Sequence, residues 1–314
     1  MISRTLIRIK AFKELYSRIT TENTNIEAAE KELILSLEKT RQLYCLMCLL
    51  PAALVPVAED KISQQNRKFK PDFSVIEINR KFANNPFSAL VKADAPFNNL
   101  CTNMGIGWAD LETPLKSVYS AMVSSDFFKE YVGKETPGME DAVKLFRQVY
   151  SNLLSGNSIL EDALEGECIW WADDLDYVLE EILKNLGKIS KAGHIDPPAL
   201  FEKKEDETFA RKLVGSVMVE YDDLAETVSS YMSNWDVSRV VQSDILIVSM
   251  GVAEAKTFSN IPFKVTIDEY VDLAKHYSTP KSYSFVNGVL NAILKDMHTQ
   301  GKITKDPIGM VGGF

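Results

Sequence analysis

Hydrophobic residues recur at helical spacing along most of the chain, and no segment competes seriously as a β-strand. Near the amino terminus, Ile2, Ile9, Phe12, Tyr16 and Ile19 form one apolar stripe, which predicts a helix over residues 4–20. The same spacing predicts further helices over 26–50, 112–131, 140–154, 205–232, 237–256, 265–277 and 281–297, with a long one beginning at Asn157. The pattern therefore predicts an all-α protein.

Proline and glycine interrupt this pattern in one stretch, residues 59–107, which is predicted to be the least regular part of the chain. The preceding helix is predicted to end before Pro51. The uncharged run 43–58 contains two prolines and is shorter than a membrane span requires, so a buried helix is expected instead. The composition of residues 301–314 predicts a flexible tail.

Composition and charge narrow the functional classes. The chain has 314 residues, of which 46% are hydrophobic and 25% charged, which is typical of a soluble globular protein. Its formal net charge is -9, yet residues 1–20 carry Arg4, Arg8, Lys10, Lys13 and Arg18 against Glu14 alone. This basic segment is either a contact for an anionic partner or a solvated helix face, and charge by itself leaves both open.

Motifs for catalysis or metal binding are absent from the sequence. It has no glycine-rich phosphate loop, zinc-protease motif or nucleophile elbow, and its three histidines lie far apart. Cys45 and Cys48 form a C-x-x-C without a second pair, which favours inert core cysteines in a reducing cytoplasm. Helical spacing spreads Asp173, Asp174 and Asp176 over different faces, which favours a solvated surface. We therefore expect no enzyme, no cofactor and no metal.

A short repeat adds a second basic feature. The letters NRKF occur at residues 66–69 and again at 79–82. Cations beside an aromatic ring can neutralise and stack on single-stranded RNA, but they can equally cover a helix surface with their apolar stems. The sequence alone does not choose between these two interpretations.

The stretch IPFKVTIDEYVDLAKHYSTPKSYSFVNGVLNAI, residues 261–293, resembles the conserved region of the NusB family of transcription antitermination factors. The matching positions are Ile261, Pro262, Lys264, Val265, Ile267, Asp268, Glu269, Val271, Leu273, Ala274, Lys275, Phe285, Val286, Asn287, Gly288, Val289 and Leu290. The segments SRTLIRIKAFKELYS and SYMSNWDVSRVVQSDILIVSMGVAEA are similar to the first helix and to an inner helix pair of that family.

The resemblance implies a NusB-like double helical bundle with a large helical insertion. Residues 1–20 and 205–300 would form the bundle, 21–204 the insertion, and 301–314 the tail. Ordinary family members are much shorter, so the chain resembles an enlarged, Bacteroidetes-type form, and the role of the insertion is open. In such a bundle Gly288 is expected where another helix passes closely, since glycine otherwise costs a helix about 1 kcal/mol.

The resemblance also implies a function in binding. Family members bind single-stranded boxA RNA of ribosomal RNA leaders together with a small-subunit ribosomal protein in its NusE role. The pair helps to load an antitermination complex onto RNA polymerase. A non-catalytic factor in the cytoplasm, without membrane contact, is therefore expected, and the sequence leaves open whether the free protein forms a homodimer.

Six residues match positions that the family uses around RNA: Arg4, Arg8, Tyr231, Lys281, Ser284 and Phe285. Arg4 and Arg8 would neutralise phosphates, although Thr5, Leu6 and Ile7 stand where further arginines are frequent. Lys281 would add positive charge, and Ser284 replaces a frequent lysine. Phe285 would stack on a base, whereas periodicity by itself places it in the core.

Two other functions remain compatible with the sequence. One is a helical protein-binding scaffold without direct RNA contact, for which the large insertion would supply the surface. The other is an RNA-modifying enzyme, because some ribosomal RNA cytosine methyltransferases carry a NusB-like domain. The chain has no cofactor-binding α/β unit and no catalytic cysteine motif, which argues against the enzyme.

Overall fold

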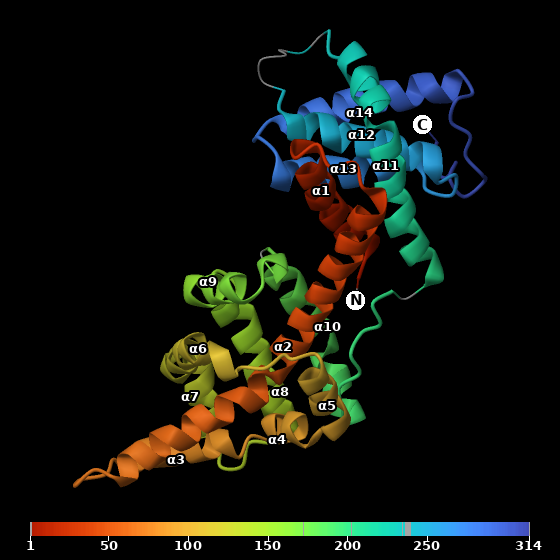
Figure 1. Ribbon diagram of the computed structural model, residues 1–314. Helices are drawn as coiled ribbons and strands as arrows, with labels where there is room; N and C mark the ends of the chain where they lie inside the picture. Colours follow the sequence, from red (N-terminus) through yellow and green to blue (C-terminus); the bar gives the residue numbers. More distant parts are fainter. Residues whose placement is uncertain (1, 172, 202, 234, 236–239, 314) are drawn as a thin grey trace. The chain divides into compact units, whose positions relative to one another are not determined.

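The computed structural model describes residues 2–171, 173–201, 203–233, 235 and 240–313. All regular secondary structure in these residues is helical, which confirms the all-α fold (Figure 1). The helices are α1 (Arg4–Thr20), α2 (Ile26–Asn66), α3 (Phe73–Ala83), α4 (Pro86–Ala93), α5 (Ala95–Asn103), α6 (Glu112–Ser124), α7 (Asp126–Gly133), α8 (Met139–Val149), α9 (Ser158–Glu167), α10 (Leu175–Ala192), α11 (Lys204–Ser230), α12 (Gln242–Thr257), α13 (Phe263–Tyr277) and α14 (Ser282–Thr299).

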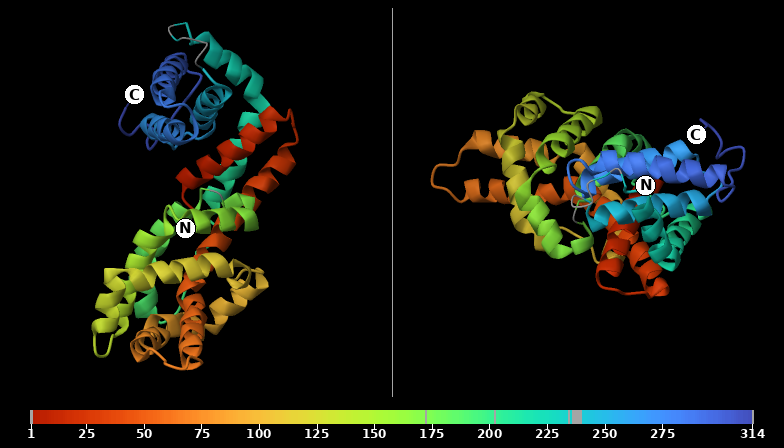
Figure 2. Two further views of the ribbon diagram at one scale, coloured as in Figure 1. Left: turned by 90° about the vertical axis from the view of Figure 1, so that its left-hand side faces the viewer. Right: turned by 90° about the horizontal axis from the view of Figure 1, so that it is seen from above.

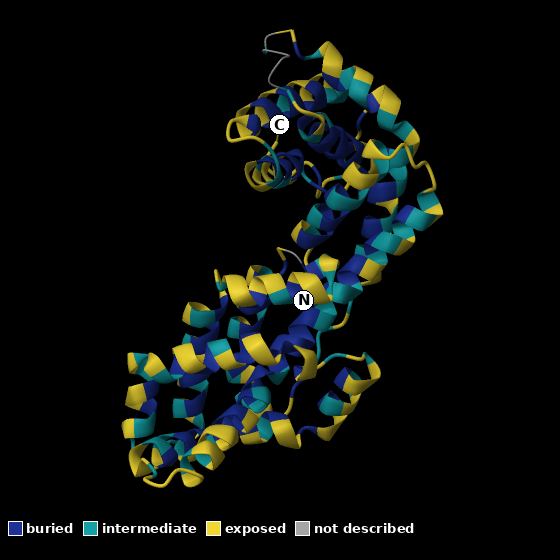
Figure 3. Ribbon diagram, turned by 60° about the vertical axis from the view of Figure 1, so that its left-hand side comes forward, coloured by how far each residue is buried: buried dark blue, intermediate teal, exposed yellow. Residues whose placement is uncertain are grey.

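The chain divides into two compact units. Unit 1 comprises Glu38–Ala199, and unit 2 combines Ile2–Leu37 with Leu200–Phe314. Helix α2 contributes its first turns to unit 2 and the remainder to unit 1. Within each unit the helices turn their buried faces inward and their exposed faces outward (Figure 3).

Helix α2 is longer than the sequence predicted, because it continues through Pro51 and Pro56 to Asn66. Pro51 has no N–H, so the carbonyl of Met47, four residues earlier, loses its helical partner. The hydroxyl of Tyr150 donates to that carbonyl at 2.8 Å, which replaces the missing bond. Among the described helices, α2 is long and apolar enough to cross a membrane, but 67% of its most apolar window is buried inside the protein. Such burial is typical of a core helix.

The segment predicted as irregular, residues 59–107, is largely helical and builds much of unit 1. Asn85 and Asp94 cap helices α4 and α5 through their side-chain oxygens, which allows short helices to follow one another. Phe82 and Phe146 lie in the aromatic core beside further buried rings. Cys45 and Cys48 are buried in the same cluster, and burial raises the pKa of Cys48 to about 12.

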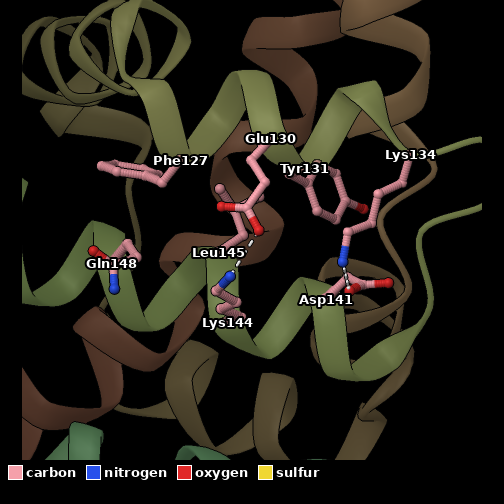
Figure 4. Close-up of a pocket in the computed structure, with 8 residues that line it drawn as sticks. All are labelled: Phe127, Glu130, Tyr131, Lys134, Asp141, Lys144, Leu145 and Gln148. Atoms are coloured by element: carbon pink, nitrogen blue, oxygen red, sulfur yellow. Dashed lines mark hydrogen bonds and ion pairs between the residues drawn. The ribbon is translucent and has the colours of Figure 1, made fainter.

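Helices α7 and α8 pack against each other at the surface of unit 1 (Figure 4). Tyr131 and Leu145 pack inward between the two helices, while Glu130 accepts a 2.7 Å hydrogen bond from Lys144 across them. Lys134 forms a second ion pair with Asp141. Exposed pairs of this kind contribute little to stability, so the apolar packing holds the two helices together.

The long helix predicted from Asn157 is broken in two. Asp173 has a φ of 63°, and the chain turns there between α9 and α10. The indole of Trp171 donates to the carbonyl of Lys39 at 2.7 Å, and Thr40 donates to Asp174 at 2.6 Å. Asp174 is therefore buried rather than solvated, because α2 supplies a hydroxyl for its carboxylate.

Unit 2 is a bundle of α1, the start of α2 and α11–α14. Helix α1 has the predicted bounds, but its buried face is displaced from the predicted stripe. Leu6, Ile7, Ala11 and Leu15 are buried, whereas Tyr16 is 40% exposed. The face that packs against α11 and α12 therefore includes positions that periodicity within α1 alone did not select.

The segment after α14, predicted as a flexible tail, lies against unit 2 in this structure. Ile303 is buried, and the amide of Asp306 donates to the carbonyl of Ser259 at 3.2 Å. The amine of Lys305 donates to the carbonyls of Ala255 and Phe258 at the end of α12. Burial lowers the pKa of Lys305 to about 8, although the position of a cation at a helix carboxyl terminus is favourable.

Three helices of unit 2 approach one another closely at Gly251 of α12. A Cβ atom there would lie 2.8 Å from Cδ2 of Leu290 and 3.2 Å from Cδ2 of Tyr270. Both neighbours are fully buried, on α14 and α13, so they have little room to move. Only glycine fits between these three helices without displacing a core side chain.

We expect Gly251→Ala to lower the free energy of unfolding by about 1–3 kcal/mol, because overpacking outweighs the gain in helix propensity. Gly215→Ala in α11 is the matched control, since its nearest contact would be an ordinary 3.5 Å from Glu30. The control should raise stability by up to about 1 kcal/mol. Urea unfolding followed by circular dichroism measures both, and equal effects would contradict the close approach.

Candidate RNA-binding face

A hollow of 810 Å³ opens at the start of α14, beside the loop that joins it to α13. Three of the six predicted residues, Lys281, Ser284 and Phe285, line it together. The other lining residues are Trp235, Val240, Asp244, Thr279, Pro280, Ser282 and Tyr283. Lys281 and Ser284 are exposed, and the first turn of α14 contains no acidic residue. The positive end of a helix and an exposed lysine thus face the same space, which suits a phosphate.

The floor of the hollow is a hydrogen-bond network around Asp244, whose side chain is buried. Ser278 donates to its carboxylate, and the backbone amide of Val241 lies 3.4 Å from its other oxygen. Ser278 also contacts the hydroxyl of Ser282 at 3.1 Å. This network ties the α13–α14 loop to the start of α12 and thereby fixes the shape of the hollow.

Phe285 forms part of the wall, with only 4% of its surface exposed. Its ring meets Trp235 edge-on, with centroids 5.3 Å apart and an interplanar angle of 83°. Gly288, one turn later, faces the same indole, and a Cβ there would lie 3.0 Å from Cζ2 of Trp235. The neighbour of Gly288 is therefore a tryptophan side chain, and the expectation of a closely passing helix is wrong for this position.

Arg8 lies on the buried side of α1 and not on a surface. Its Nε donates to Glu254 at 2.7 Å and its Nη2 to the other carboxylate oxygen at 3.0 Å. Burial alone would lower the pKa of Arg8, but the carboxylate of Glu254 more than offsets this and the pKa is raised. The side chain of Arg8 is 4% exposed, so its guanidinium is enclosed by protein and not open to phosphate.

Arg4 and Tyr231 are reachable from solvent but lie apart from the hollow in their contacts. Arg4 pairs with Asp206 at 2.8 Å, stacks over Phe209, and lines a separate hollow of 290 Å³. The hydroxyl of Tyr231 donates to Asp296 of α14 at 2.9 Å. The structure thus gathers three predicted residues in one place and leaves three elsewhere.

Two residues that line the hollow escaped the sequence reasoning. These are Trp235 and Tyr283, and Tyr283 is 42% exposed. The signal that could have found Trp235 is Gly288, because a glycine within an amphipathic helix indicates a bulky neighbour.

The residues that line the hollow all lie in a region that resembles known proteins. The NusB family matches residues 200–295, which span α11 to most of α14. The chain is 35% identical over 113 residues to the transcription antitermination protein NusB of Salinibacter ruber, and this alignment covers 36% of the chain and 71% of that protein. The chain belongs to the NusB family.

Two more NusB proteins support the assignment. The chain is 37% identical over 92 residues to NusB of Finegoldia magna, covering 29% of the chain and 67% of that protein. It is 29% identical over 135 residues to NusB of Chloroherpeton thalassium, covering 43% and 63%. No solved structure gives a significant match to the chain.

Membership of the NusB family makes the chain a transcription antitermination factor. Tyr231, Lys281, Ser284 and Phe285 lie within the matched residues, whereas α1, with Arg4 and Arg8, lies before them. Unit 1, which ends at Ala199, lies wholly outside the match as well. The family match thus covers the residues of the hollow at α14 and does not cover the helices from α3 to α10.

Proposed function

We propose that the chain binds single-stranded boxA-type RNA of ribosomal RNA leader transcripts together with a small-subunit ribosomal protein in the NusE role. The observation that carries the proposal is the hollow at α14, which combines a helix amino terminus, the exposed Lys281 and the aromatic side chains of Tyr283 and Trp235. A cation beside stacking rings is the usual arrangement for holding a single strand.

In this proposal Lys281 neutralises a phosphate and Tyr283 offers its exposed ring to a base. Ser284, also exposed, can hydrogen-bond to sugar or phosphate. Arg4 and Tyr231 supply further contacts apart from the hollow, and Phe285 holds the wall through Trp235. Arg8 contributes indirectly, because its hydrogen bonds to Glu254 hold α1 against α12.

The protein partner is inferred from charge and family. The net charge of -9 suits a basic ribosomal protein, since opposite charges speed and orient association. The resulting pair would join an antitermination complex on RNA polymerase in the cytoplasm, where bacterial transcription takes place. The chain's own part in this is binding.

Fluorescence anisotropy with a labelled boxA-like RNA tests the proposal, with and without the ribosomal partner, over a series of salt concentrations. Lys281→Gln should weaken binding and reduce the slope of log affinity against log salt by about 0.7. Lys264→Gln is the matched control, because Lys264 is exposed at the opposite end of α13. It should leave the RNA affinity unchanged.

The same titration decides on a second candidate, a protein-binding scaffold without RNA contact. The enclosure of Arg8 and the pairing of Arg4 with Asp206 favour it, because both reduce the positive charge open to RNA. Partner-dependent binding that weakens with salt and with Lys281→Gln supports the RNA function. Binding to the ribosomal protein alone, with no effect of RNA, supports the scaffold.

A further inference from the structure

The two NRKF stretches differ in burial: the second belongs to the core of unit 1, and the first is exposed to solvent. In the second, on α3, Asn79 accepts a 2.6 Å hydrogen bond from Tyr119, and Phe82 is fully buried among aromatic rings. Lys81 donates to the carbonyls of Val132 and Lys134 at 2.9 Å. This copy is therefore part of the core of unit 1 and has no free aromatic ring.

The first stretch lies at the end of α2 and continues into the loop before α3. Figures 1 and 2 show this loop at the outer end of unit 1, beyond the other helices of that unit. Phe69 is 98% exposed and Phe73 is 76% exposed, more than any other large hydrophobic side chain in the described residues. Arg67, Lys68 and Lys70 are exposed between and beside them.

The loop has a defined backbone although its side chains project into solvent. The amides of Arg67 and Lys68 donate to the carbonyls of Ser63 and Gln65 at 3.3 Å and 3.0 Å. Asp72 caps α3 by accepting from the amides of Ser74 and Val75. Across the ranges that the structure describes, no hydrogen bond or ion pair engages the side chains of the three cations. Their charge is thus available to a partner.

We propose that this loop, residues 66–73, is a second binding site for single-stranded RNA. Phe69 and Phe73 would each stack on a base, and Arg67, Lys68 and Lys70 would neutralise the adjoining phosphates. The site deepens the proposed function, since it rests on the chain meeting RNA, but it uses none of the residues of the hollow at α14.

The chemistry of the loop favours RNA over a lipid surface or an apolar protein groove. Only two large apolar side chains are present, and the carboxylate of Asp72 lies next to one of them. Insertion into a membrane requires a larger continuous apolar face than this. Cations that alternate with flat rings match a polymer that itself alternates phosphates with bases.

A second hollow, of 330 Å³, extends the proposed site along unit 1. Its lining includes Gln64 of α2 and Val75 of α3, each two residues from the loop. Lys61 and Lys116 also line it, together with Asp60, and Lys116 pairs with Glu112 at 2.5 Å. A strand held by the loop could therefore continue over a surface to which Lys61 adds one further cation.

Anisotropy with a fluorescein-labelled ten-nucleotide oligouridine tests the loop in the full chain. All variants carry Lys281→Gln and Tyr283→Ala, so that the hollow at α14 contributes little to the signal. Phe69→Ala with Phe73→Ala should weaken binding by roughly fivefold or more for each ring. Neutralising Arg67, Lys68 and Lys70 to glutamine should reduce the salt slope by about 2.

Exposed positions elsewhere in unit 1 provide the controls. Lys188→Gln with Lys191→Gln removes two exposed positive charges from α10, and Ile169→Ala removes an exposed apolar side chain. These controls should leave the affinity unchanged. A photocrosslink from 4-thiouridine should map to the peptide that contains the loop.

Two results would overturn the second site. One is an oligouridine affinity that the loop variants leave unchanged. The other is loss of binding to phosphatidylglycerol-containing vesicles in those variants while RNA binding persists. Failure of the proposed boxA function gives a different result. In that case Lys281→Gln, in an otherwise unchanged chain, leaves the affinity for boxA-like RNA unchanged.

Discussion

Replacing Arg8 with methionine should lower the free energy of unfolding of unit 2 by about 3–5 kcal/mol. The carboxylate of Glu254 is fully buried and accepts from Arg8, from Thr266 at 2.9 Å and from Tyr270 at 3.1 Å. Without Arg8, the buried carboxylate of Glu254 loses its ion-pair partner. Two neutral hydroxyls remain around it, together with Glu269, a partly exposed carboxylate that also pairs with Arg8. Urea unfolding followed by circular dichroism measures the loss.

Two further variants separate the ion pair from simple packing. Arg8→Met combined with Glu254→Gln removes both charges, keeps an acceptor for one of the two hydroxyls and offers the other an N–H from which it can accept, so a substantial part of the stability should return. Lys31→Met breaks a pair with Glu27 whose members are 72% and 79% exposed, and it should leave the stability nearly unchanged. If Arg8→Met weakened RNA binding without loss of stability, the family-based role in phosphate contact would hold instead.

Arg8 also shows where sequence reasoning reaches its limit. The bounds of α1 follow from local periodicity and from Ser3, whose hydroxyl accepts from the amide of Leu6. The i, i+4 spacing correctly places Arg4 and Arg8 on neighbouring turns. Which of them faces solvent depends on Glu254, 246 residues later, and no local pattern contains that information.

The same limit explains the errors in unit 1. Helix α2 passes Pro51 because Tyr150, 99 residues further on, supplies a hydrogen bond to the freed carbonyl. The helix predicted from Asn157 breaks because Trp171 and Asp174 bond to α2. In each case a hydrogen bond to a residue far away in the sequence determined where the helix ends, and the local sequence pattern did not contain that information.

The site was predictable in part for the opposite reason. Lys281 is the N-cap residue of α14, and Ser284 and Phe285 follow in its first residues, so their proximity follows from sequence spacing and from the family resemblance. Trp235 itself lies in none of the helices that the structure describes. From the sequence, Gly288 indicated only that some bulky side chain would lie against it, not which one.

Replacing Phe285 with alanine should lower the free energy of unfolding of unit 2 by about 3–5 kcal/mol, because a buried ring leaves a cavity beside Trp235. RNA affinity would then fall with the folded structure, so this variant alone does not show that the ring stacks on a base. Tyr283→Ala separates the two effects, since Tyr283 lines the same hollow but is 42% exposed. Its effect on stability should stay within about 0.5 kcal/mol.

The affinity of Tyr283→Ala for boxA-like RNA should fall by the equivalent of about 1–3 kcal/mol, the usual cost of one lost stack. Anisotropy and urea unfolding on the same preparations give both numbers for each variant. Phe285→Leu adds a check, because it refills most of the cavity without restoring an aromatic face. If Phe285→Leu recovers both stability and RNA affinity, Phe285 acts as the wall that positions Trp235. If it recovers stability alone, and Tyr283→Ala leaves the affinity unchanged, the base stacks on Phe285 itself, and the ring must then become exposed when RNA binds.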